Sequence, residues 1–150
     1  MFLATKKLFK AQKLNTSSNF KGIILVRVLV VDDDFEDLTT MKQVLMGNKF
    51  EVSVATNGAQ AIDMTGVEDF DLFLIDVKMP TLSGYDLVRL IREKYKGSAK
   101  IVFVSIVPKR EVEIKEVDGF VQKPFSPKDL VSVVKKVLGG KDGGKKSKKK

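Results

Sequence analysis

Apolar residues recur along the chain in five short runs, each closed by polar residues or a turn. The predicted strands span residues 26–31, 50–54, 72–75, 101–105 and 120–122. The first and third runs are almost continuously apolar and suit strands buried on both faces, whereas the second alternates like a more exposed edge strand.

Helical spacing of apolar residues fills most of the intervals between these runs. The predicted helices run from Asp34 to Gly47, over 59–64, from about 85 to Gly97, and from Ser126 to Gly139. Asp34 is the expected N-cap of the first helix, and Pro127 suits the first position of the last one. Strands that alternate with helices predict an α/β fold with a parallel sheet and helices on both faces.

Polar residues end or directly follow four of the predicted strands. A parallel sheet brings the carboxyl ends of its strands to one edge, where Asp32, Asp33, Asp76, Ser105 and Lys123 should meet. Three carboxylates in one crevice repel one another, so at least one pKa should rise unless a cation lies between them. A hard divalent cation with oxygen ligands is the natural partner, and Mg²⁺ also binds phosphate.

The composition excludes several classes of chemistry. The chain has no cysteine, which excludes disulfides and thiolate metal sites, and no histidine, which excludes a histidine base or phosphocarrier. The longest apolar run, 23–31, is interrupted by Arg27 and is too short to span a bilayer. We therefore expect a cytoplasmic protein with no membrane span.

The net charge of +8 comes from the two ends of the chain. Residues 1–22 contain five lysines and no acid, residues 139–150 contain six lysines and one aspartate, and the remainder is slightly acidic. This distribution does not favour a basic nucleic-acid-binding domain. We expect a disordered or weakly helical extension at 1–22, a folded domain at 23–138 and a disordered tail at 139–150.

Four blocks of sequence resemble those of a known family. They are VLVVDDD at 28–34, LIDVKMPTLSG at 74–84, FVS at 103–105 and FVQKPF at 120–125. These blocks resemble, in the same order, the signatures of the response-regulator receiver domain, the phosphoacceptor module of two-component signalling. The similarity covers about residues 24–138 and implies a flavodoxin-like sheet with strand order 2-1-3-4-5.

The resemblance implies a role for each residue of the expected cluster. Asp76 would be the phosphoacceptor, and Asp32, Asp33, Asp76 and the backbone carbonyl of Lys78 would bind Mg²⁺. Lys123 would contact the phosphoryl group, and the peptide bond that follows it would be cis.

Two further residues correspond to the family's conformational switch. Ser105 would donate its hydroxyl to a phosphoryl oxygen, and Phe120 would turn inward into the space that Ser105 vacates. The partners would be a sensor histidine kinase or histidine phosphotransfer protein and an unknown downstream protein. The resemblance is to a stand-alone receiver, with no dedicated DNA-binding domain and no enzymatic activity beyond its own phosphorylation and hydrolysis.

One segment departs from the family pattern. Only 17 residues separate Ser105 from Lys123, and Lys109–Glu116 is largely charged. The helix between the fourth and fifth strands should therefore be about one turn short, or be replaced by a loop.

Two other functions stay open. A phosphatase of the haloacid-dehalogenase type would use Asp32 and Asp34 with Ser105 and Lys123, but it would leave Asp76 without a role. A receiver-like binding module that is never phosphorylated is the second alternative.

Overall fold

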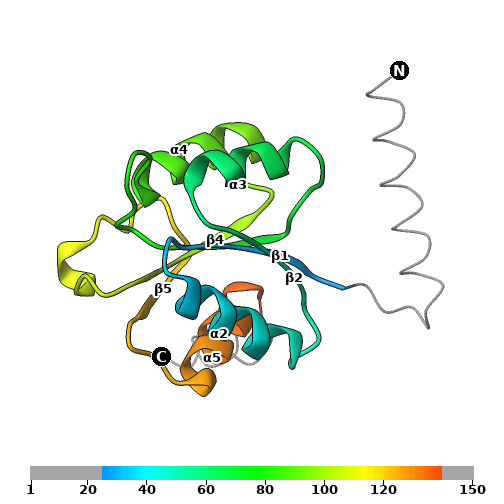
Figure 1. The fold of residues 1–150 in the computed structure, drawn as a ribbon, viewed down its shortest axis with the longest axis vertical. Helices are drawn as coiled ribbons and strands as arrows, with labels where there is room; N and C mark the ends of the chain where they lie inside the picture. Colours follow the sequence, from blue (N-terminus) through cyan, green and yellow to red (C-terminus); the bar gives the residue numbers. More distant parts are fainter. Residues whose placement is uncertain (1–24, 140–150) are drawn as a thin grey trace.

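Five parallel strands form a single sheet in the order β2-β1-β3-β4-β5, which confirms the predicted fold class. The structure, a computed structural model, describes residues 25–139 (Figure 1). The strands are β1 (Arg27–Val31), β2 (Glu51–Ala55), β3 (Leu72–Ile75), β4 (Lys100–Ser105) and β5 (Gly119–Gln122). The expectations for residues 1–22 and for the tail beyond Gly139 lie outside the described residues.

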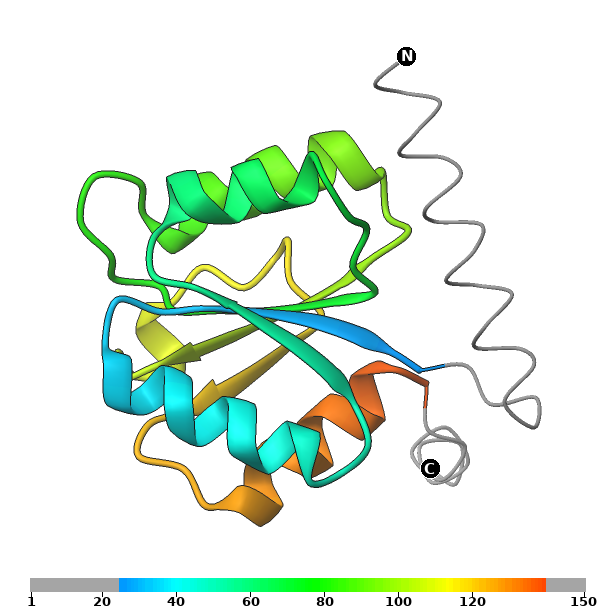
Figure 2. The ribbon, with the colours of Figure 1, turned by 45° about the vertical axis from the view of Figure 1, so that its right-hand side comes forward.

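Within residues 25–139, two pairs of helices cover the sheet, one pair on each face (Figures 1 and 2). The helices are α2 (Phe35–Met46), α3 (Gly58–Thr65), α4 (Gly84–Tyr95) and α5 (Pro127–Val137). Helices α2 and α5 lie together on one face, and α3 and α4 lie together on the other. Each helix begins after a side-chain cap, and Asp34 caps α2 as predicted, by accepting a hydrogen bond from the Asp37 N–H.

Burial on both faces explains why the central strand, β3, is apolar at every position. Leu72 and Leu74 pack into the core layer beneath α2 and α5, whereas Phe73 and Ile75 pack into the layer beneath α3 and α4. All four side chains are fully buried. Burial of such a side chain stabilises a fold by about 1.5–3 kcal/mol, so β3 fixes the position of whatever follows it.

Strand β2 begins one residue later than predicted. The Phe50 N–H donates to the Leu45 carbonyl at 3.1 Å and so completes the end of α2 instead of opening the strand.

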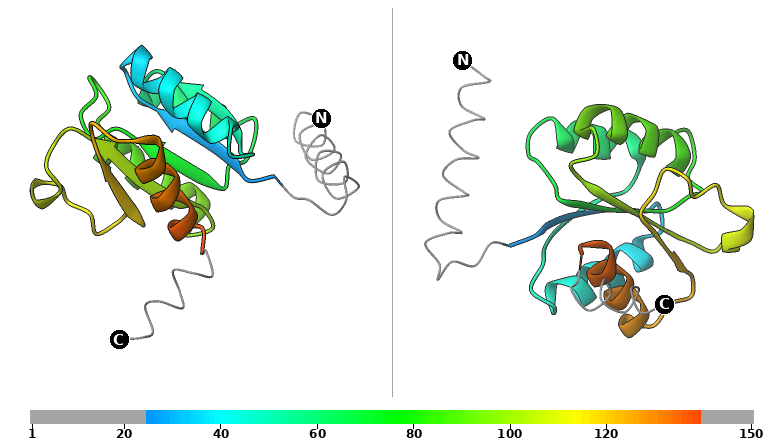
Figure 3. Two further views of the ribbon diagram at one scale, coloured as in Figure 1. Left: turned by 90° about the horizontal axis from the view of Figure 1, so that it is seen from below. Right: turned by 180° about the vertical axis from the view of Figure 1, so that it is seen from behind.

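The segment between β4 and β5 contains no α-helix. The expectation of a loop in place of the helix is therefore correct, and that of a helix one turn short is not. A single 3₁₀ turn, η1 (Lys109–Glu111), interrupts an extended loop at the edge of the molecule (Figure 3, right). Pro108 precedes this turn without a side-chain cap, and Val112 is the segment's one buried hydrophobic residue. A longer helix here would lack the apolar stripe that holds a helix against a core.

No helix within 25–139 has both the length and the apolar character that a membrane crossing requires.

Candidate functional site

Three carboxylates meet at the carboxyl edge of the sheet. Asp32 and Asp33 follow β1 directly, and Asp76 follows β3, which is paired with β1 in parallel. One carboxylate oxygen from each residue lies within 4.8 Å of the others. Asp32 is fully buried and Asp76 is 7% exposed, whereas Asp33 faces solvent. The structure thus brings together the three acidic residues that the sequence placed at this edge.

Asp32 is fixed by hydrogen bonds on both carboxylate oxygens. Its Oδ1 accepts from the Asp34 N–H at 2.9 Å, and its Oδ2 accepts from Lys123 Nζ at 2.7 Å. Burial raises the pKa of Asp32, and these two hydrogen bonds oppose the rise by stabilising the ionised form.

Backbone contacts fix the position of Asp76, and its carboxylate belongs to the acidic cluster. The Asp76 N–H donates to the Val31 carbonyl at 3.0 Å, and the start of α4 packs against the Asp76 backbone. A Cβ at Gly84 would lie 2.3 Å from the Asp76 carbonyl oxygen, so this close approach requires glycine. Burial, followed by the negative charge of Asp32, raises the pKa of Asp76 to about 6, as the expected repulsion between carboxylates requires.

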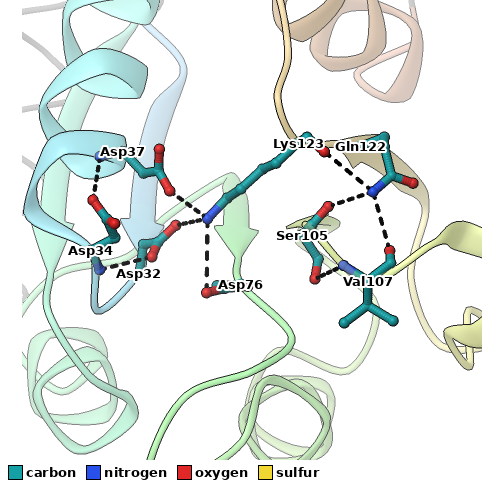
Figure 4. A network of polar contacts seen from close by, with 8 residues as sticks. All are labelled: Asp32, Asp34, Asp37, Asp76, Ser105, Val107, Gln122 and Lys123. Carbon is teal, nitrogen blue, oxygen red and sulfur yellow. Dashed lines mark hydrogen bonds and ion pairs between the residues drawn. The ribbon is translucent and has the colours of Figure 1, made fainter.

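Lys123 brings one positive charge into the acidic cluster from the end of β5 (Figure 4). Its side chain is 9% exposed, and Nζ lies 2.7 Å from Asp32 Oδ2 and 3.8 Å from Asp76 Oδ2. Burial alone would lower the pKa of Lys123, but its carboxylate partners outweigh that effect and the pKa is raised. The Lys123–Pro124 peptide bond is cis, as the resemblance implied.

Asp37 is a member of this site that the sequence did not indicate. Its Oδ2 accepts from Lys123 Nζ at 2.7 Å, as short a contact as that of Asp32. Asp37 lies in the first turn of α2, where an acidic residue ordinarily serves the helix N-terminus. The only signal for it was that this helix starts at the same sheet edge as the cluster.

Ser105 lies at the same edge but its hydroxyl bonds locally. The Oγ accepts from the Val107 N–H at 3.1 Å, and Ser105 is fully buried. The hydroxyl hydrogen remains available to a second acceptor. Phe120, the other expected switch residue, is half-buried and packs against the core layer beneath α3 and α4.

Gln122 fixes the loop that follows Ser105. Its Nε2 donates to the carbonyl oxygen of Ser105 at 3.1 Å (Figure 4). It also donates to the carbonyl oxygen of Ile106 at 3.0 Å. The amide thus connects the ends of β4 and β5 beside the acidic cluster.

The donor set suits a hard divalent cation. Three carboxylates, those of Asp32, Asp37 and Asp76, lie within 3.8 Å of Lys123 Nζ, and Asp33 adds a fourth to the acidic cluster, so negative charge exceeds positive charge at the site. The side chains of Asp32, Asp33 and Asp76 offer only oxygen ligands, and of these three residues Asp33 is the exposed one. Oxygen ligands with room for water are what Mg²⁺ requires.

Comparison with known proteins decides the family. The model of the response regulator receiver domain matches residues 28–135. The chain belongs to this family. Among curated proteins, the nisin biosynthesis regulatory protein NisR of Lactococcus lactis is 35% identical over 115 residues, covering 74% of this chain and 49% of NisR. The transcriptional regulatory protein CpxR of Escherichia coli is 31% identical over 119 residues, covering 75% of this chain and 49% of CpxR.

Solved receiver structures share the fold over their whole length. Chemotaxis protein CheY4 of Vibrio cholerae superposes with a TM-score of 0.72 at 27% identity, covering 77% of this chain and all of CheY4. Response regulator TrrA of Thermotoga maritima, in complex with Mg(2+)-BeF, gives 0.70 at 31% identity and covers 76% of this chain and all of TrrA. The receiver spans about half the length of curated relatives such as NisR and CpxR.

Proposed function

We propose that this receiver accepts a phosphoryl group on Asp76 from a phosphohistidine of a sensor histidine kinase or histidine phosphotransfer protein. The observation that carries the proposal is the position of the Asp76 carboxylate. It ends a fully buried strand, lies among two further carboxylates, and has Lys123 Nζ 3.8 Å from its Oδ2.

In the transfer, a carboxylate oxygen of Asp76 forms a bond to phosphorus as the P–N bond of the donor breaks. The donor imidazole keeps the electron pair of that bond, and the product is a mixed anhydride at Asp76. Hydrolysis by water later returns the carboxylate and releases phosphate. Negative charge gathers on the phosphoryl oxygens, and the Lys123 ammonium, 3.8 Å from Asp76 Oδ2, would move toward them to offset that charge.

Mg²⁺ would be held by the carboxylates of Asp32, Asp33 and Asp76 and by the backbone carbonyl of Lys78. When bound, it supplies positive charge that relieves the repulsion between these carboxylates and binds phosphoryl oxygens. The backbone N–H of Lys78 opposes the rise in the pKa of Asp76, which supports placing this loop at the site. The TrrA complex with Mg(2+)-BeF supports the same assignment by similarity.

The switch would use the residues at the ends of β4 and β5. Phosphorylation adds charge and strong acceptor oxygens, which would attract the buried Ser105 hydroxyl away from the Val107 N–H. Phe120 would then turn inward, and the face formed by β4, β5 and their connecting loop would change for a downstream protein. The loop at 106–118, with a 3₁₀ turn in place of an α-helix, would form part of this face.

A mass measurement tests the proposal. The protein is incubated with acetyl phosphate and Mg²⁺, and its intact mass is recorded. We expect a gain of one phosphoryl group in the wild type and in the control Asp63→Asn, an exposed α3 substitution, and no gain in Asp76→Asn. Absence of any gain in the wild type would favour the binding module, and sustained hydrolysis of small phosphate esters by Asp76→Asn would favour the phosphatase.

A further inference from the structure

Lys123 makes its two short contacts away from the proposed phosphoacceptor. Its Nζ lies 2.7 Å from Asp32 Oδ2 and 2.7 Å from Asp37 Oδ2, but 3.8 Å from Asp76 Oδ2 (Figure 4). In this state the lysine is therefore directed toward β1 and the start of α2. A lysine that serves a phosphoryl group on Asp76 has to redistribute these contacts.

Asp32 and Asp37, the two carboxylates that accept hydrogen bonds from Lys123, differ in their environment. Asp32 belongs to the cluster that fits a divalent cation, and a bound cation would neutralise it independently of Lys123. Asp37 is absent from that cluster, and its side chain is 34% exposed. Asp37 is consequently the carboxylate that still competes for the lysine after the cation has bound.

The position of Asp37 is fixed by its helix. Its N–H donates to the Asp34 cap at 3.0 Å, so the first turn of α2 sets the direction of the side chain. Two-thirds of its side chain is shielded from solvent, which limits screening of the ion pair by water.

We propose that Asp37 is a positioning residue that holds Lys123 away from Asp76 until a phosphoryl group replaces it as the partner of the lysine. This inference rests on the proposed function. Exchange of Lys123 from the Asp37 carboxylate to a phosphoryl oxygen costs one ion pair, and that cost weakens the phosphorylated state. Asp37 thus sets how readily the switch turns on and how long it stays on.

The substitution Asp37→Asn tests the inference by binding of beryllofluoride, a phosphoryl mimic, in the presence of Mg²⁺. We expect its affinity for the mimic to rise by at least about threefold, the effect of one partly exposed ion pair. Asp37→Glu, which keeps the charge, should lie closer to the wild type. The Lys123 Cε resonance of metal-free Asp37→Asn should also shift relative to wild type, which reports the lysine directly without any ligand.

Asp129→Asn is the matched control for helix and charge effects. Asp129 occupies the same position in α5 as Asp37 does in α2, with its N–H bonded to the Ser126 cap at 3.0 Å. We expect this variant to bind the mimic like the wild type. An equal gain in Asp129→Asn would assign the effect to net charge and overturn the inference, as would unchanged or weaker binding by Asp37→Asn. Failure of the wild type to bind the mimic would instead overturn the proposed function.

Discussion

The substitution Asp76→Asn should stabilise the metal-free domain at neutral pH. Asp76 is 7% exposed, and its pKa is about 6 compared with an ordinary value of 3.8. Since one pKa unit corresponds to about 1.4 kcal/mol, ionised Asp76 reduces the free energy of unfolding at pH 7 by about 3 kcal/mol. An asparagine of nearly the same size does not carry this charge, so we expect a gain of about 2–3 kcal/mol.

The pH dependence follows from the direction of the shift. The unfolded chain ionises this side chain as the pH rises above 3.8, whereas the folded domain keeps its proton until about pH 6. The folded state therefore binds more protons in this window, and the cost of Asp76 develops as the pH rises through it. The advantage of Asp76→Asn should accordingly fall below about 1 kcal/mol near pH 4.

Urea unfolding, followed by far-ultraviolet circular dichroism in a chelator-containing buffer, measures this difference at pH 4 and pH 7. Asp63→Asn, an exposed substitution in α3, should change the free energy of unfolding by no more than about 0.5 kcal/mol at either pH. A variant Asp76→Asn that is no more stable than the wild type at pH 7, or that gains equally at both pH values, would show that ionised Asp76 does not destabilise the domain.

Three further substitutions test how the site is built. Lys123→Met should lower the free energy of unfolding at pH 7 by about 3 kcal/mol or more, because fully buried Asp32 loses its counter-charge. Adding Asp32→Asn to this variant should restore most of the lost stability in the same urea assay. Gly84→Ala should lower the free energy of unfolding by about 2 kcal/mol, because the added Cβ would lie 2.3 Å from the Asp76 carbonyl oxygen. Gly47→Ala, whose Cβ would have its nearest contact at 3.4 Å, should be nearly neutral when both variants are compared by thermal unfolding. Gln122→Ala removes the hydrogen bonds to the carbonyls of Ser105 and Ile106, so it should speed hydrogen exchange of the 106–118 amides by at least about fivefold, the equivalent of one hydrogen bond. Unchanged protection, or an equal effect of exposed Gln43→Ala, would contradict this.

The fold was predictable because local patterns and topology agreed. Continuous apolar runs identified strands with helices on both faces, and the parallel arrangement then placed residues 32, 33, 76, 105 and 123 at one edge. The loop at 106–118 was predictable for a similar reason, since a short charged segment offers no apolar stripe.

The role of Asp37 was not predictable because it depends on geometry between distant elements. Its contact with Lys123 requires a particular placement of α2 against the end of β5 and a particular side-chain direction of the lysine. Its position in the first helical turn already has an ordinary explanation, the favourable interaction of an acid with a helix N-terminus. The hydrogen bonds of Gln122 to two carbonyls were not predictable for the same reason, because they depend on how the loop after β4 folds back.

Chemical trapping of the phosphorylated protein identifies the residue that carries the phosphoryl group. Borohydride reduces an aspartyl phosphate to homoserine, so treatment after incubation with acetyl phosphate and Mg²⁺ marks the acceptor residue for peptide mass spectrometry. We expect homoserine at position 76 and at no other aspartate. Homoserine at position 32 or 33, or an unmodified Asp76 in protein that has gained a phosphoryl group, would contradict it.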